Sequence, residues 1–118
     1  MRMRILALAL LFAGCTSAVL AESPADQGYR KLTGPQIRKA FVGKNFTDET
    51  HFSDHFKADG TIDGYSIGRK ISNTWKIVKD ELCITNDLGE LCYAVWKKGA
   101  DVQLVFRDSD VPLYGLLK

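Results

Sequence analysis

The sequence is short of the residues on which most enzymes and metal proteins depend. Its 118 residues include only two histidines and three cysteines. It has no Gly-x-Ser-x-Gly segment, no glycine loop that could cradle a phosphate, and no Cys/His set at metal-ligand spacing. Neighbouring acids such as Asp48 and Glu49 would face opposite sides of a strand and could not share one substrate. We therefore predict a non-enzymatic protein with no catalytic residue, metal or cofactor.

Long hydrophobic runs are also missing. The apolar stretch over residues 5–13 is shorter than the roughly 20 residues that a bilayer-spanning helix needs, and no later segment comes close. Arg2 and Arg4 precede this stretch, and small residues follow it as far as Ala21. This order predicts a secretory signal peptide over residues 1–21, cleaved after Ala21. We expect a periplasmic or secreted protein without a transmembrane span.

A second processing route competes for the same segment. Phe12 to Cys15 resembles a bacterial lipobox, in which the cysteine is lipidated, so a lipid anchor at Cys15 and an outer-membrane lipoprotein form the alternative. Either route removes or modifies Cys15. Cys83 and Cys92 are then left in an oxidising compartment, where a pair of cysteines is expected to bond.

Charge of either sign is not in excess once the signal is removed. Loss of Arg2 and Arg4 lowers the 16 lysines and arginines to 14, equal to the 14 acidic residues. A neutral domain without a Lys/Arg cluster in its sequence argues against nucleic acid or an anionic membrane as the partner. Residues 22–31 are polar and contain Pro and Gly, and we predict a flexible leader there. Residues 32–118 are expected to form one domain.

A hairpin is expected between Glu81 and Trp96. Two apolar-rich runs flank a group of turn-forming residues, and a turn centred on Asp87–Leu88 pairs residues whose numbers sum to 175. Cys83 then lies directly opposite Cys92, within bridging range. We predict a cross-strand disulfide, worth about 2.5–3 kcal/mol in the chain-entropy model.

The remaining pattern is that of short strands separated by turn signals every 8–12 residues. Short connections favour an up-and-down meander, and closure would remove its exposed edges. We predict a mainly β fold, an antiparallel meander of 7–8 strands closing into a small barrel, with one short helix packed on it near residues 35–42. The expected strands are Asn45–Glu49, His51–Lys57, Thr61–Ile67, Ile71–Val78, Glu81–Asn86, Glu90–Lys97, Val102–Asp108 and Leu113–Leu117.

Alternation along the strands predicts which side chains share a face. In the hairpin, one face carries Leu82, Ile84, Leu91, Tyr93 and Val95, and the other carries Cys83, Cys92, Ala94 and Trp96. Both faces are apolar, so something must cover the second. We expect the helix, through its apolar stripe, to cover the outside of this hairpin; a β-bulge that turns Trp96 inward is the alternative.

The two histidines share one face of their strand. His51 and His55 would lie about 13 Å apart, too far to hold one ion. Surface histidines are the simplest interpretation, and a ligand-binding or proton-sensing role is the alternative.

Aromatic residues are the remaining candidates for function. Phe52, Phe56, Trp75, Tyr93 and Phe106 are expected to point into the barrel. They either fill the interior, as in small closed barrels, or line a cup for a small apolar ligand.

The order of several short segments resembles a pattern in short exported bacterial proteins of unassigned function. The segments are Leu32-Thr33-Gly34, Asp59-Gly60-Thr61, Trp75, Leu82-Cys83, and Cys92-Tyr93 with Val95-Trp96. The general layout also resembles lipocalin-like ligand carriers and small periplasmic inhibitors of secreted metalloproteases. In those inhibitors the disulfide lies early in the chain, whereas Cys83–Cys92 lies late.

From these observations we expect one of two functions. The motive for the first is the signal segment together with the surplus of aromatic residues. The first is an exported, non-enzymatic β-barrel of the bacterial envelope that binds a small apolar ligand or acts as an interaction module toward an envelope protein. The alternative is a periplasmic inhibitor that acts on a secreted protease through its N-terminal leader.

Overall fold

The computed structural model describes residue 14, residues 22–107, residue 109 and residues 111–118. The expected signal segment, with the lipobox cysteine Cys15, lies outside the described residues apart from Gly14. The elements are β1 (Arg30–Lys31), α1 (Gly34–Phe41), β2 (Asn45–Thr47), β3 (Phe52–Phe56), β4 (Thr61–Ser66), β5 (Arg69–Val78), β6 (Glu81–Asn86), β7 (Gly89–Lys98), β8 (Asp101–Val105) and β9 (Leu113–Leu117).

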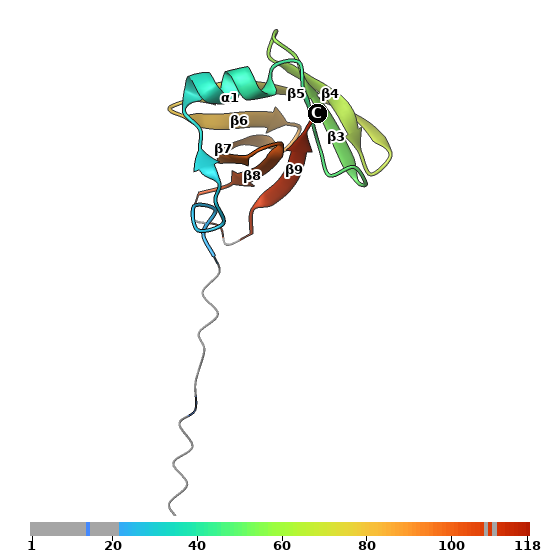
Figure 1. Cartoon of the computed structure of the whole chain (residues 1–118). Coiled ribbons are helices and arrows are strands. Elements are labelled where there is room, and N and C mark those ends of the chain that lie inside the picture. Colours follow the sequence, from blue (N-terminus) through green and yellow to red (C-terminus); the bar gives the residue numbers. More distant parts are fainter. Residues whose placement is uncertain (1–13, 15–21, 108, 110) are drawn as a thin grey trace, which may run out of the picture.

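Strands β2 to β9 form a closed antiparallel barrel (Figure 1). Each strand pairs with the next one along the chain, and β9 returns to pair with β2. The eight predicted strands and the meander order are confirmed. Each of these eight strands therefore has a partner on both sides, which is the physical advantage of this topology.

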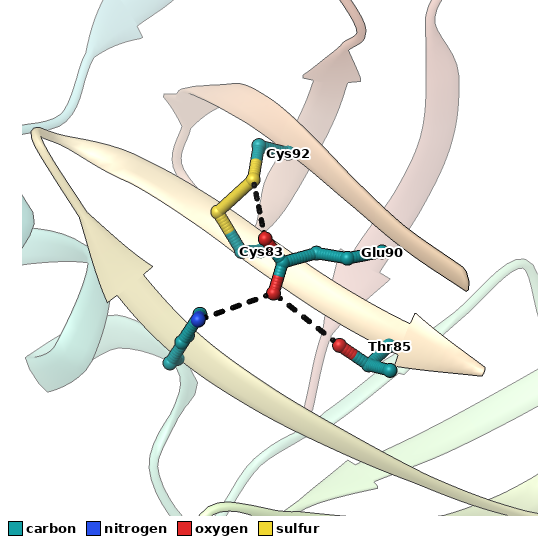
Figure 2. Close-up of a disulfide and its surroundings, with 5 residues drawn as sticks. Cys83, Thr85, Glu90 and Cys92 are labelled. Atoms are coloured by element: carbon teal, nitrogen blue, oxygen red, sulfur yellow. Dashed lines mark hydrogen bonds and ion pairs between the residues drawn. A yellow bond between two sulfur atoms is a disulfide. The ribbon is translucent and has the colours of Figure 1, made fainter.

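The hairpin β6–β7 has the predicted register. Leu82 pairs with Tyr93 and Ile84 with Leu91, and every pair in the hairpin sums to 175. Cys83 and Cys92 face each other with their Cα atoms 4.0 Å apart and are joined by a disulfide (Figure 2). The predicted cross-strand staple is therefore present.

Two of the tight turns require left-handed backbone. In the β5–β6 turn, Lys79 and Asp80 have φ values of 48° and 60°, and in the β4–β5 turn, Ile67 and Gly68 have 50° and 74°. Two consecutive residues with positive φ match the twist of the flanking strands. Ile67 is the unfavourable member, because a β-branched side chain seldom adopts this conformation.

Helix α1 is fixed at its first turn by the barrel itself. The backbone N–H of Thr33 donates to the side chain of Gln36, and the N–H of Gly34 donates to Asp80 Oδ1 at 2.6 Å. Asp80 belongs to the β5–β6 turn, so this bond joins the helix N-terminus to one end of the barrel.

The helix closes that end of the barrel instead of covering the outside of the hairpin. Ile37 and Phe41 are fully buried, and the Phe41 ring lies 4.9 Å from the ring of Phe56 and 6.0 Å from that of Phe46. Phe46 and Phe56 point inward, so the expectation that α1 covers the Cys83 and Cys92 face was wrong. The interior exposed at one end of an eight-stranded barrel offers more apolar surface to a two-turn helix than the outer wall does.

The segment before the helix is also held in place. Arg30 and Lys31, assigned from the sequence to a flexible leader, form β1 and pair with Lys97 and Trp96 on the edge of β7 that β6 leaves free. Farther back, the side chains of Gln27 and Gln103 are joined by a hydrogen bond of 3.0 Å. Gln103 points out of the barrel and is nevertheless buried, since this segment covers β8.

Candidate functional site

The barrel interior is divided into a packed half and an open half. At the helix end, apolar side chains fill the interior completely; they are Ile37, Phe41, Phe46, Phe56, Ile62, Trp75, Leu82, Val95, Val102 and Leu104. The indole N–H of Trp75 donates to the carbonyl of Lys57 at 2.9 Å, so its one polar atom is satisfied. This half is a conventional dry core.

A pocket of about 570 Å³ occupies the other end. Strands β3, β4, β5, β6, β7 and β9 and the β6–β7 turn supply its lining. The lining residues are Phe52, Asp54, Ser66, Lys70, Ile71, Ser72, Asn73, Ile84, Asn86, Asp87, Leu88, Tyr93 and Leu113. The volume lies within the usual range for small-molecule sites. Six of these residues are hydrophobic and seven are polar or charged, and the charged ones are Asp54, Asp87 and Lys70.

Asp54 is the unusual member of this lining. Its register partners are Phe46 on β2 and Gly64 on β4. Its Oδ1 is buried and has no hydrogen-bond partner among the described residues. Desolvation by burial raises the pKa of Asp54 from 3.8 to about 6.

The space beside Asp54 depends on a glycine. A Cβ at Gly64 would lie 2.1 Å from the carbonyl oxygen of Ser53 and 3.0 Å from the Asp54 Cα, so no side chain fits there. The strands β3 and β4 approach closely at this point, and Gly64 lets them do so. The strand position beside Asp54 therefore carries no side chain.

The five aromatic residues singled out from the sequence divide between the two halves. Phe52 and Tyr93 line the pocket, and Phe106 packs on Tyr93 with ring centroids 6.1 Å apart. Phe56 and Trp75 instead belong to the packed core, where their rings lie 5.6 Å apart. The structure thus brings three of the five to the open end.

Sequence reasoning missed Asp54 as a candidate. The sequence pattern did point to Asp54, because alternation along the strand places it on the same inward face as Phe52 and Phe56. A charged residue between two inward-facing aromatics is the pattern that marks a polar group inside a barrel.

The two histidines have separate local partners. His51 Nδ1 lies 2.7 Å from Asp48 Oδ2, and His55 Nδ1 lies 2.6 Å from Asn45 Oδ1. Desolvation raises the pKa of Asp48, but hydrogen bonds from three backbone N–H groups and from His51 outweigh it and hold this pKa well below its ordinary value. Asp48 therefore serves the β2–β3 turn, and His51 is part of that turn.

The disulfide lies in a small polar group on the outer wall (Figure 2). Glu90 reaches Thr85 Oγ1 at 3.4 Å, Lys76 Nζ at 3.3 Å and Cys92 Sγ at 3.7 Å. Cys83, Glu90 and Cys92 are the described residues whose donor atoms lie close enough to hold a metal ion. Both sulfurs are taken by the disulfide, so this group is a structural staple in the form described here.

Comparison of the chain with protein-family models, with curated proteins and with solved structures finds no match. Within the described part of the chain, no helix has the length and apolar character needed to cross a membrane.

Proposed function

We propose that this protein is an exported, non-enzymatic β-barrel of the bacterial envelope that binds a small ligand in the pocket at its open end. The ligand has an apolar body and a cationic amine or another N–H donor. The observation that carries the proposal is the buried, unpartnered carboxylate oxygen of Asp54 in the wall of that pocket. A disulfide agrees with an oxidising compartment, which supports export.

The apolar part of the proposal follows from the walls. Phe52, Ile84 and Tyr93 supply hydrophobic and aromatic surface from three strands. Burying apolar surface there contributes roughly 25 cal/mol per Å². The expected purely apolar ligand would leave Asp54 unsatisfied, and for this reason we extend the proposal to a ligand with a donor.

The polar part follows from the cost of an unpaired carboxyl group. A buried acceptor without a partner costs about 1–3 kcal/mol, and a hydrogen bond to a charged group recovers about 1.5–3 kcal/mol. An ammonium or amide N–H placed against Asp54 removes this penalty, and Asn73 and Ser66 offer further polar contacts in the same lining. Perturbed titratable groups in a cleft are typical of functional sites.

A matched pair of probes tests the proposal. We expect octylamine to bind the purified protein about tenfold more tightly than octan-1-ol, since the two differ only in the head group. Titration followed by calorimetry or by amide chemical shifts would measure both. The Asp54→Asn variant should lose the preference for the amine and keep its affinity for the alcohol.

The control is Asp63→Asn, which removes a carboxylate from the outer face of β4, where Asp63 forms an ion pair with Lys57. It should leave both affinities unchanged. Equal binding of amine and alcohol by the unmodified protein, or failure of either to perturb Phe52 and Tyr93, would refute the proposal. Native mass spectrometry of protein taken from its own envelope would then identify the natural ligand.

Protease inhibition through the leader receives no specific support from the contacts. Lys98 Nζ donates to the Gln27 carbonyl at 3.0 Å, and β1 is paired with β7. These contacts tie the described leader residues to the barrel wall, whereas an inhibitory segment must project into a protease cleft.

A further inference from the structure

A second pocket lies at the helix end, and all the charged residues in its lining are positive. It has a volume of about 740 Å³ and is formed by β1, α1, the α1–β2 loop, the β7–β8 turn and the end of β9. Its lining residues are Arg30, Lys31, Leu32, Gln36, Lys39, Ala40, Lys44, Lys97, Gly99, Ala100 and Leu117. Five of them are cationic and none is acidic.

The fold brings these cations together from distant parts of the sequence. Pairing of β1 with β7 sets Arg30 opposite Lys97, an arrangement of like charges that disfavours the sheet. Lys39 and Lys44 stand on the far wall, on α1 and the loop that follows it. Among the described residues, none of these four makes an ion pair.

A stabilising effect on the helix or the strands explains only part of this clustering of cations. Lys39 lies in the last turn of α1, where a cation favours the helix dipole. That effect does not apply to Arg30 and Lys97, which belong to strands. The cluster thus opposes folding locally, as groups retained for binding do.

We propose that this pocket binds a small anion with two or more phosphate or carboxylate groups. A concave surface of one sign, with low-dielectric walls, concentrates anions far more than an exposed patch does. Arg30 can pair with a phosphate or carboxylate through two parallel hydrogen bonds, and the lysines add point charges. Leu32, Ala40 and Leu117, all partly buried against the core, form apolar surface between the charges. The volume suits a small molecule.

This site is independent of the open-end pocket. No residue lines both pockets, and their charges differ: the open-end pocket holds Asp54, Asp87 and Lys70, whereas the charged residues of the other are five cations. Binding at the two ends can therefore be tested separately.

Inorganic triphosphate is the probe for the experiment. We expect one triphosphate to bind per purified chain, with affinity that falls as salt concentration rises. It should shift the amide resonances of Leu32, Ala40 and Ala100. The Lys39→Gln, Lys44→Gln double variant should bind about tenfold more weakly or worse, because two charge-assisted contacts are lost.

The matched control is Lys76→Gln with Lys79→Gln, which removes the same charge from positions that line neither pocket. It should retain the affinity of the unmodified protein. If both double variants lost triphosphate affinity equally, net charge alone would explain the loss and the proposal would be overturned. So would the absence of triphosphate binding at low salt, or binding to phosphatidylglycerol vesicles without binding to triphosphate. If the Gln variants unfold, the amide shifts in the unmodified protein still decide between these outcomes.

Discussion

The two ends of the barrel differ in how their interior is packed and in which residues form their turns. At the helix end, Phe41 and Ile37 fill the interior and the β5–β6 turn is polar. At the other end Phe52, Ile84 and Tyr93 are only partly buried around the pocket, and the turns expose aliphatic side chains: Ile67, Leu88 and Val111 are 81%, 97% and 82% exposed. The buried side chains at the helix end stabilise the fold. The open end buries less apolar surface, exposes the aliphatic residues of its turns and leaves room for a ligand. The contrast indicates that stability and binding are assigned to different halves of one small domain.

The largest expected difference between the ends comes from the buried side chains at the helix end. Phe41→Ala should lower the free energy of unfolding by about 3–5 kcal/mol, because it empties a fully buried site. Leu88→Ala, at the open end, should change it by no more than about 0.5 kcal/mol. Urea unfolding with the disulfide intact measures both. Similar losses would mean that the two ends contribute equally to stability.

The staple in the wall should have the next largest effect. Replacement of both Cys83 and Cys92 by serine should lower the free energy of unfolding by about 2.5–3 kcal/mol, since the cross-link restricts the unfolded chain. Octylamine binding should persist in the folded fraction, because neither cysteine lines the open-end pocket. A loss of binding at full folding would show that the wall and the pocket are coupled.

Asp54 should make stability depend on pH at the open end. Its pKa is about 6 in the folded state against 3.8 for the ordinary group. The folded state then binds more protons at Asp54 between these values, so the contribution of Asp54 to stability is most favourable below about pH 3.8 and falls until about pH 6. Above pH 6, Asp54→Asn should stabilise the protein by about 1–2 kcal/mol, a value discounted for the partial exposure of this carboxyl group.

Urea titrations of both proteins at pH 4 and pH 7.5 give the comparison. The unmodified protein should lose stability relative to Asp54→Asn as the pH rises. An unchanged difference between the two would mean that Asp54 does not carry the penalty. Octylamine should restore part of the lost stability at pH 7.5, since it binds the folded state only.

The smallest expected effect lies at a tip of the open mouth. Ile67→Asn should raise the free energy of unfolding by about 1 kcal/mol, because asparagine accepts the left-handed conformation that isoleucine resists. The thermal midpoint is a sufficient measure. A destabilised variant would show that the exposed isoleucine makes contacts that outweigh its backbone strain.

Local patterns in the sequence were sufficient for most of the fold. Turn-forming residues and period-two alternation are properties of neighbouring residues, so the eight strands and the Cys83–Cys92 register could be derived directly. The helix could be located as well, from Pro35 and Gly43, but its docking site could not. Covering a barrel end or a barrel wall uses the same apolar stripe, and only the closed geometry decides between them.

The pocket residues were harder to predict. The basic pocket joins Arg30 to Lys97 through a two-residue strand that has no sequence pattern of its own. The count of charged residues showed a neutral domain, and it could not show that five cations gather in one pocket. Asp54 could have been found by its face, but its missing hydrogen bond depends on which side chains the closed barrel brings near it.

Strand β9 runs from one pocket to the other, and its pairing with β2 is short. Its ladder with β2 has two pairs, Phe46 with Leu117 and Thr47 with Leu116, extended by reciprocal backbone hydrogen bonds between Asn45 and Lys118, whereas β4 and β5 share six pairs. Leu113, at one end of β9, lines the open pocket, and Leu117, at the other, lines the basic pocket. Breathing of the barrel should therefore begin at this short pairing, and β9 amides should exchange with deuterium sooner than those of β4. A molecule held at either mouth would slow that exchange along the whole strand.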